Sequence, residues 1–195
     1  MAIGLVGSEM CIRDRPHIAG LKTHVDMTDG FSMEEWAKVI DVAKKHDLML
    51  FEDRKFADIG RVTETQMAGM YDIRSWADLV TSHSVSGPDI VDGIASAWDS
   101  VQRVGGVLLL AQMSSRGNLL DASYTERTME IGTSSPHVIG YIGNGSNPNE
   151  VSELREKAGD GKMIWTPGVN LSDNEGALGQ RYGHPSDAIK AGSDA

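Results

Sequence analysis

The sequence has little of three features that direct a chain toward particular classes of protein. With one cysteine, Cys11, in 195 residues, it cannot form an internal disulfide, so a reducing compartment is expected. No apolar run reaches the roughly 20 residues that a membrane-spanning helix requires. Arg13 and Arg15 follow the apolar part of the N-terminal segment, which is the reverse of the order in a secretory signal. These absences predict a cytoplasmic protein that makes no membrane contact.

Basic residues are also scarce relative to acidic ones. The chain has 18 Lys and Arg against 28 Asp and Glu, a formal net charge of −10. A nucleic-acid-binding surface requires clustered Lys and Arg, so no nucleic-acid partner is expected. A phosphate-bearing small molecule is not excluded, because a few local groups can bind it. The histidines lack the spacing of metal ligands, so we expect no metal site.

Short apolar runs alternate with amphipathic stretches after residue 15, which is typical of βα units and a parallel sheet. A capping box at residues 32–35 predicts a helix there, and further helices are predicted at 61–71, after Pro88, at 149–157 and at 186–190. Six strands are predicted, at residues 18–25, 48–51, 76–80, 107–111, 138–142 and 163–165. A closed (β/α)8 barrel has eight strands in roughly 250 residues. The expected fold is therefore an α/β barrel of the TIM type, incomplete here because the first and eighth strands are missing.

The first 15 residues show no periodicity that continues into the rest of the chain, and Pro16 marks the join. We expect residues 1–15 to be foreign to the native fold and residues 16–195 to form a partial barrel domain. The alternative is an ordinary flexible N-terminus.

Charged residues come directly after the second predicted strand. In α/β barrels, catalytic groups lie at the carboxyl ends of the strands. Residues two apart in an extended chain point the same way, so Asp53 and Lys55 should face one site, with Asp58 beyond a turn. Lys22, at the end of the preceding predicted strand, adds a second amine. From the residues alone, the cluster is either a proton-transfer site or a solvated strand end.

Six stretches, in order, resemble orotidine 5'-monophosphate decarboxylases. The run LFEDRKFADIG at residues 50–60 is similar to the eukaryotic form of the family signature almost letter for letter. The other matching stretches are LKTHVD at 21–26, WAD at 76–78 with His83, LLLAQMSSRG at 108–117, TPGV at 166–169 and ALGQRY at 177–182. The resemblance covers the chain from about Ile18 to Ala195.

This resemblance implies a cofactor-free lyase that forms UMP in pyrimidine biosynthesis. It implies catalytic roles for Lys22, Asp53, Lys55 and Asp58, with Lys55 as the general acid that protonates C6 of the pyrimidine. Asp58 would cross a homodimer interface to complete the partner's site. The substrate-binding positions that it implies are His24, Thr63, Ser114, Pro167, Gln180 and Tyr182. Two accounts of catalysis stay open, repulsion of the substrate carboxylate by Asp53 and stabilisation of a C6 carbanion by Lys55; both need a charged Lys55.

The chain departs from the family pattern in three places. The family's first strand is absent, and so is its eighth, with the phosphate-binding Arg. The family's Gly-Asn-Thr after Asp-Ile reads Gly60-Arg61-Val62-Thr63 here. We therefore expect the 195 residues, expressed alone, to fold poorly and to be inactive, while the complete gene product is active. The alternatives are a nucleotide-binding or dimerising fragment without activity, and a magnesium-dependent sugar-phosphate lyase of the same superfamily.

Overall fold

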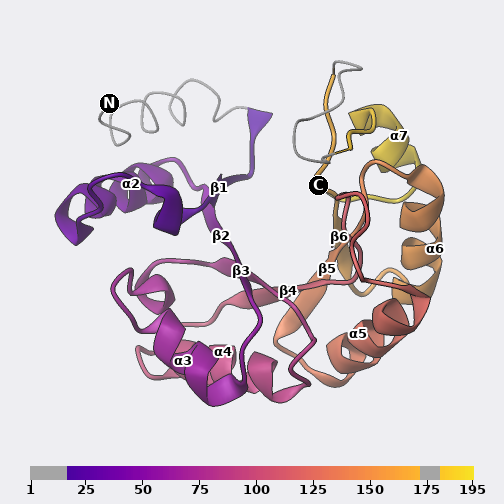
Figure 1. Cartoon of the computed structure of the whole chain (residues 1–195). Helices are drawn as coiled ribbons and strands as arrows, with labels where there is room; N and C mark the ends of the chain where they lie inside the picture. The colour runs from indigo at the N-terminus through magenta and orange to yellow at the C-terminus, as the bar shows by residue number, and fades with distance from the viewer. Residues whose placement is uncertain (1–16, 172–180) are drawn as a thin grey trace. The chain divides into compact units, whose positions relative to one another are not determined.

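The computed structural model describes residues 17–171 and 181–195 (Figure 1), and these form two compact units. The first unit comprises residues 17–81 and 89–106, and the second comprises 82–88, 107–171 and 181–195. In each unit, helices and parallel strands alternate along the chain, and the strands lie in chain order. The fold class is therefore α/β, as predicted, with six strands in the described residues.

The first unit carries the strands that hold the charged residues. Strand β1 (Gly20–Thr23) pairs in parallel with β2 (Met49–Phe56), and β3 (Leu79–Ser82) follows β2 in the sheet order. The register sets Lys22 opposite Phe51 and Thr23 opposite Glu52, which brings the charged ends of β1 and β2 together. The helical elements of this unit are α2 (Met33–Lys45), α3 (Gly60–Met67), α4 (Asp89–Asp99) and the short 3-10 helices η2 (Val25–Met27) and η3 (Ile73–Ser75).

Helix α2 begins as the capping box predicts. The Ser32 hydroxyl accepts the backbone N–H of Glu35 at 3.2 Å, which satisfies one of the free donors of the first turn. Trp36 is buried on the inner face of the helix and lies edge-on to Trp76, with 5.1 Å between ring centroids. This aromatic contact fastens α2 to the segment that leads into β3.

Helices α3 and α4 approach closely because each presents a glycine at the contact. A Cβ on Gly93 would lie 2.2 Å from the carbonyl oxygen of Gly60, and a Cβ on Gly60 would lie 2.3 Å from that of Asp89. No side chain fits at either distance. The two glycines therefore permit a backbone-to-backbone contact that fixes α3, the helix that comes after the charged end of β2.

The second unit is built on three further strands. Strand β5 (Val138–Ile142) pairs in parallel with both β4 (Gly106–Leu110) and β6 (Met163–Trp165). Every residue of β4 is buried, as expected for a barrel strand covered on both faces. Figure 1 shows helices α5 (Ala122–Ser134), α6 (Pro148–Ala158) and α7 (Pro185–Lys190) in orange to yellow; α5 contacts β5, and α6 contacts both β6 and α7.

Several elements differ from the sequence-based predictions. The strand predicted at 18–25 spans only Gly20–Thr23, and the helix predicted at 61–71 spans Gly60–Met67. Strand β2 was predicted to end at Phe51 but extends to Phe56. It lies between β1 and β3 in the sheet, so the charged residues after Phe51 belong to the strand and not to a loop. The strand predicted at 76–80 begins only at Leu79, because the backbone N–H groups of Trp76 and Ala77 bond back to the carbonyl of Ile73 in η3. Helix α5 had no predicted counterpart; its N-cap is Asp121, whose carboxylate accepts the N–H of Tyr124 at 2.8 Å. The strands at Val138–Ile142 and Met163–Trp165 match their predictions.

The prediction for residues 1–15 lies outside the described residues. Within the described ranges, no helix combines the length and apolarity needed to cross a bilayer.

Candidate active site

A cluster of charged side chains lies in the first unit, centred on the carboxylate of Asp53. Its Oδ2 atom lies 2.8 Å from Lys55 Nζ, 3.3 Å from Lys22 Nζ and 3.4 Å from His24 Nε2. The Asp53 side chain is only 9% exposed, whereas those of Lys22 and Lys55 are 48% and 38% exposed. The cluster thus has a buried anion at its base and two ammonium groups that remain accessible to a ligand.

The geometry of the strands explains why these residues meet. Side chains two apart on an extended strand point to the same face, so Phe51 and Asp53 of β2 share one direction. Lys55 departs from the extended conformation, with φ of +52°, and its amine reaches the same carboxylate at 2.8 Å. Lys22 is paired with Phe51 across the sheet and therefore projects on that face as well. The predicted juxtaposition of Lys22, Asp53 and Lys55 is present in the structure.

Thr81, at the end of β3, is a member of this cluster that the sequence did not reveal. It is completely buried, and its hydroxyl donates to Asp53 Oδ1 at 2.9 Å. The same hydroxyl oxygen accepts the backbone N–H of Lys55 at 2.9 Å. Thr81 therefore positions both the carboxylate of Asp53 and the backbone of Lys55. A lone threonine in an apolar strand gives no sequence signal for such a role.

The backbone of Lys55 is in the left-handed region, with φ of +52°. This conformation is costly for a residue with a Cβ, by roughly 1–2 kcal/mol. Non-glycine residues in this region are enriched at functional sites, where the surrounding structure holds them in place. At Lys55, the hydrogen bond from its N–H to Thr81 and the ion pair with Asp53 supply that hold.

Burial and charge act in opposite directions on the acid at the centre of the cluster. Burial acts to raise the pKa of Asp53, but the hydrogen bond and charge of Lys55, with smaller contributions from Lys22 and Thr81, outweigh it and leave the pKa below its ordinary value. Burial lowers the pKa of His24 and, together with the two lysines, outweighs the attraction of Asp53. At neutral pH, Asp53 is therefore ionised and His24 is neutral.

Glu52 occupies the opposite face of β2 from Asp53 and is completely buried. Its carboxylate accepts the Thr23 hydroxyl at 2.6 Å and the backbone N–H of Val25 at 3.1 Å. Burial raises the pKa of Glu52 to about 7, although these two hydrogen bonds act to lower it. In the sequence, Glu52 was only one of several charged residues after a strand, and the pattern gave no sign that it faces the interior.

Asp58 and Thr63 lie beyond the end of β2, in the turn and the helix that succeed the Asp53 cluster along the chain. Asp58 is exposed, and its Oδ1 accepts the N–H of Ile59 at 2.8 Å. Thr63, on α3, is completely buried, and its hydroxyl donates to the backbone carbonyl of Asp58 at 3.1 Å. In this structure, Thr63 thus supports the backbone that carries Asp58.

The other expected substrate-binding residues belong to the second unit. Ser114 is buried after β4, and its carbonyl oxygen accepts Arg181 Nε at 3.0 Å. Pro167 is exposed, and its carbonyl accepts the N–H of Gly145 at 3.2 Å. Tyr182 is 42% exposed. Gln180 lies outside the described residues.

A family model described as orotidine 5'-phosphate decarboxylase / HUMPS family matches residues 8–195. The chain belongs to this family. Among curated relatives, orotidine 5'-phosphate decarboxylase of Kodamaea ohmeri is 39% identical over 183 residues, which cover 92% of the chain and 68% of the relative. The enzyme of Torulaspora delbrueckii is 41% identical over 183 residues, with 92% of the chain and 67% of the relative covered. These relatives support an assignment of the chain as an orotidine 5'-phosphate decarboxylase.

Two solved structures of decarboxylases named for the same activity show the fold. The enzyme from Pyrococcus horikoshii OT3 superposes with a TM-score of 0.75 at 21% identity and covers 100% of this chain and 83% of its own. The enzyme from Methanocaldococcus jannaschii, complexed with the inhibitor BMP, gives a TM-score of 0.70 at 19% identity, with coverage of 97% and 78%. Both agree with the TIM-type barrel class that the sequence predicts.

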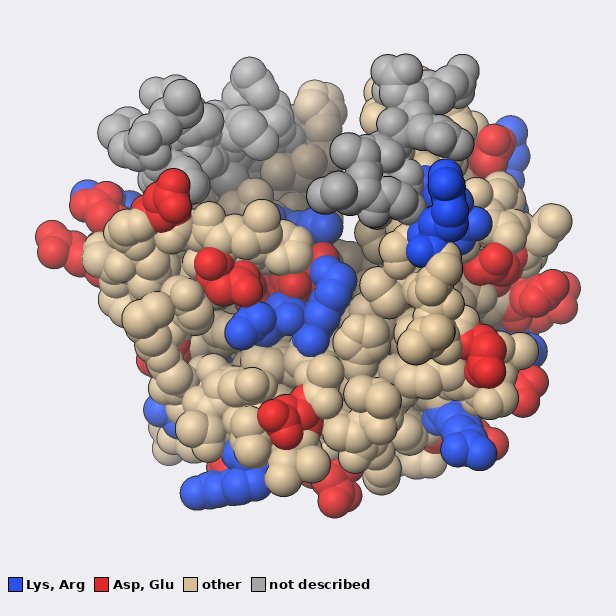
Figure 2. All heavy atoms as spheres, in the orientation of Figure 1, with Lys and Arg blue, Asp and Glu red and all other residues tan. Residues whose placement is uncertain are grey.

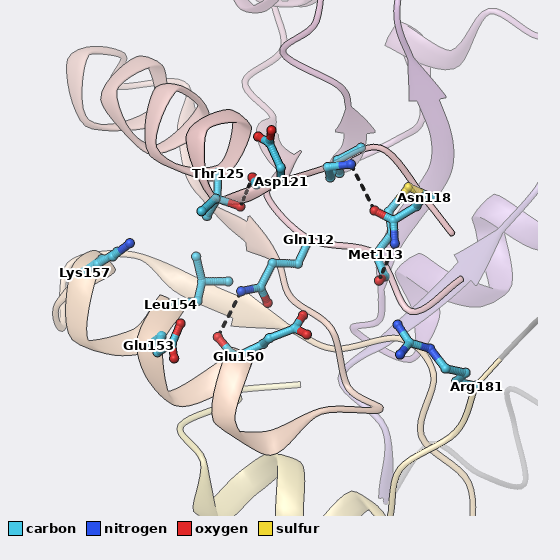
Figure 3. Close-up of a pocket in the computed structure, with 12 residues that line it drawn as sticks. Gln112, Met113, Asn118, Asp121, Thr125, Glu150, Glu153, Leu154, Lys157 and Arg181 are labelled. Carbon is cyan, nitrogen blue, oxygen red and sulfur yellow. Dashed lines mark hydrogen bonds between the residues drawn. The ribbon is translucent and has the colours of Figure 1, made fainter. Parts of the chain in front are cut away.

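The decarboxylase-family chain also has a cavity of about 280 Å³ within the second unit (Figure 3). Gln112 spans it: its amide nitrogen donates to the Glu150 carbonyl at 2.9 Å, and its amide oxygen accepts the N–H of Asn144 at 3.0 Å. Lys157 and Arg181 line it together with three acidic side chains, Asp121, Glu150 and Glu153. Its lining belongs to the second unit alone, so it is not formed by the Asp53 cluster.

On the face drawn in Figure 2, Lys and Arg side chains lie among Asp and Glu side chains instead of forming one broad basic patch. In the described ranges, no group of three or more His, Cys, Asp or Glu side chains is arranged to hold a metal ion.

Proposed function

We propose that this protein decarboxylates orotidine 5'-monophosphate to UMP, with Lys55 as the proton donor. The observation that carries the proposal is the contact of Lys55 Nζ with Asp53 Oδ2 at 2.8 Å, beside Lys22, within the family signature. In the proposed step, the bond between C6 and the carboxylate breaks, and its electron pair stays on C6. Lys55 Nζ then transfers a proton to C6 as carbon dioxide leaves.

The alternation of charges supports this chemistry energetically. A carboxylate about 4 Å from ionised Asp53 would be repelled by roughly 4 kcal/mol at an effective dielectric constant near 20. Relief of that repulsion as carbon dioxide departs corresponds to about three decades of rate. The ammonium of Lys55 favours the same step by lowering the energy of the transition state. The negative charge that it stabilises develops on C6 only there.

The second unit is proposed to supply contacts to the rest of the nucleotide. Ser114 would hydrogen-bond the pyrimidine, and Gln180 and Tyr182 would belong to the loop on the phosphate side. His24, Thr63 and Pro167 complete the proposed substrate-binding set. No metal or organic cofactor is needed for the proposed step, because the proton donor and the charges are side chains.

The test is formation of UMP from orotidine 5'-monophosphate by the complete gene product, with the 195 residues alone assayed in parallel. Lys55→Ala should reduce kcat by at least about a thousandfold, since it removes both the proton donor and the charge. The matched control is Lys38→Ala, which removes an exposed lysine that pairs with Glu35 on α2 and should leave kcat unchanged. A complete gene product that binds UMP without forming it from the substrate would refute the proposed activity.

The same assay separates the magnesium-dependent sugar-phosphate lyase, which is the rival enzyme. The proposed decarboxylation should continue at an unchanged rate in excess chelator. A rate that collapses in chelator and returns with magnesium would favour the rival.

We also propose a homodimer in which Asp58 completes the partner's site. The exposure of Asp58 at the end of β2, next to the cluster in sequence, supports this role. Subunits that carry Asp58→Ala and subunits that carry Lys55→Ala should each be inactive alone. After they are mixed and exchanged, heterodimers with one intact site should recover part of the activity. Failure of the mixture to recover any activity, with exchange verified, would contradict a shared site.

A further inference from the structure

Glu52 is a completely buried carboxylate next to the proposed catalytic residues in sequence, and the decarboxylation chemistry does not use it. Alternation along β2 directs its side chain away from the face that carries Asp53 and Lys55. A carboxylate without partners in this position would be strongly unfavourable. Its retention in the interior therefore calls for specific contacts.

Those contacts are with the segment that comes after β1. Glu52 Oε2 accepts the Thr23 hydroxyl at 2.6 Å, and the N–H of Val25 lies 3.1 Å from Oε1 and 3.2 Å from Oε2. Thr23 and Val25 flank His24, and Lys22 immediately precedes Thr23. The Glu52 carboxylate thus binds the chain on both sides of His24 and directly after Lys22. Both of these residues contact Asp53.

The two faces of the β1–β2 pair therefore carry different sets of contacts. On one face, Lys22 and His24 approach Asp53 Oδ2 at 3.3 and 3.4 Å. On the other face, Thr23 and Glu52 are paired in register and hydrogen-bonded. A shift of the segment at residues 23–25 would move both Lys22 and His24 relative to the Asp53 carboxylate.

We propose that Glu52 is a positioning residue for the decarboxylation, because its carboxylate clamps residues 23–25 and thereby holds Lys22 and His24 against Asp53. The proposal rests on the proposed function and names a further residue on which that reaction depends. Glu52 does not touch the reacting atoms; it acts through the two side chains that it places.

The clamp depends on the ionisation of Glu52. An ionised carboxylate accepts from both Thr23 and Val25, whereas a protonated one replaces one acceptor position with an O–H donor. Burial raises the pKa of Glu52 to about 7, with Asp26 raising it further and Arg54, which pairs with Asp26 at 3.2 Å, lowering it. The clamp is therefore complete above neutral pH and weakened below it.

The experiment compares Glu52→Gln and Thr23→Val with the unmodified complete gene product, and uses Glu34→Gln, an exposed position on α2, as the control. Glu52→Gln should lower kcat about tenfold at pH 8, the effect of losing one hydrogen bond to a charged group. Thr23→Val removes one donor and should produce a loss of similar size, while Glu34→Gln should have no effect.

Two readouts distinguish positioning from a general loss of structure. The unmodified protein should show a step in kcat with an apparent pKa near 7 that Glu52→Gln abolishes, the variant staying at the low-pH level throughout. Hydrogen exchange at the Val25 amide should accelerate in Glu52→Gln, while amides of β4 keep their protection.

The outcomes separate the two proposals. If the unmodified protein forms no UMP, the proposed function itself fails, and the positioning role fails with it. If it forms UMP and the Val25 amide loses protection in Glu52→Gln, but kcat and its pH profile are unchanged, only the positioning role is overturned.

Discussion

The hydroxyl of Thr81 donates to Asp53 Oδ1 at 2.9 Å from a strand, β3, that carries no charged side chain of its own. Because the same oxygen accepts the N–H of Lys55, one small side chain holds both partners of the central ion pair.

Replacement of Thr81 by Val should therefore impair catalysis more than folding. Val preserves the volume but removes the donor to Asp53 and the acceptor for the Lys55 N–H, so we expect kcat to fall by about tenfold or more. Thr81→Ser, which keeps the hydroxyl, should retain most of the activity. Steady-state kinetics of UMP formation measure both. Equal activity of the Val and Ser variants would show that the hydroxyl does not position the pair.

Asp53→Asn separates the two accounts of catalysis. If repulsion by Asp53 contributes, the neutral amide should bind the substrate more tightly, so that KM falls together with kcat. If stabilisation of the carbanion by Lys55 dominates, kcat should fall while KM stays close to its original value. Because the structure shows Asp53 also holding Lys55 at 2.8 Å, we expect a large loss of kcat in either case, and the change in KM decides.

The pH dependence of stability should carry opposite contributions from the two neighbouring acids. The pKa of Asp53 is below its unfolded value, so its contribution is present above about pH 4 and is lost as the pH falls further. The pKa of Glu52 is raised from 4.5 to about 7, so its contribution is complete at low pH and is lost as the pH rises through 7.

Glu52→Gln isolates the second contribution. Between pH 4.5 and 7, the unmodified protein should lose up to about 3 kcal/mol of unfolding free energy relative to this variant, given the shift and 1.36 kcal/mol per pKa unit. Urea unfolding at several pH values measures this difference, in which contributions common to both proteins, such as that of His24, cancel. Parallel stability profiles would show that Glu52 does not titrate in this range.

The contact between helices α3 and α4 can be tested at Gly93. A methyl group there would lie 2.2 Å from the Gly60 carbonyl oxygen, so Gly93→Ala should destabilise the protein by roughly 1–3 kcal/mol. Gly161→Ala is the matched control, because a Cβ at Gly161 meets nothing within 4 Å. Thermal unfolding of the two variants should therefore differ clearly, and an unchanged melting temperature for Gly93→Ala would be inconsistent with the close approach.

Patterns of apolar residues predicted most of the fold, because buried parallel strands read as short apolar runs and surface helices as one-sided apolar stripes. The strands at Val138–Ile142 and Met163–Trp165 are short apolar runs bounded by polar residues, and they were located to the residue. Helix α5 was missed because three of its four buried positions, Thr125, Thr128 and Gly132, are small or polar, and the remaining one, Met129, does not make an apolar stripe. The extent of β2 was underestimated because its charged residues resemble a loop until the pairing with neighbouring strands is known.

Strand alternation and parallel pairing predicted part of the Asp53 cluster. These rules bring Lys22 and Asp53 together without knowledge of the third strand. Lys55 was predicted to join them by alternation, and it does, but with a left-handed backbone whose N–H is bonded to Thr81 of that third strand. The roles of Thr81 and Glu52 could not be predicted, because each depends on a partner brought close by the fold. Thr81 acts 28 residues from Asp53, and Glu52 acts 29 residues from Thr23.

Because the backbone of Lys55 is left-handed, selection for stability and selection for turnover should favour different residues at position 55. Glycine or asparagine adopts this conformation at little cost, so variants chosen only for resistance to unfolding should drift toward those residues at position 55. Variants chosen for turnover should keep lysine. The difference in stability between the two kinds of variant measures the conformational cost that the protein accepts to keep the Lys55 amine at this position.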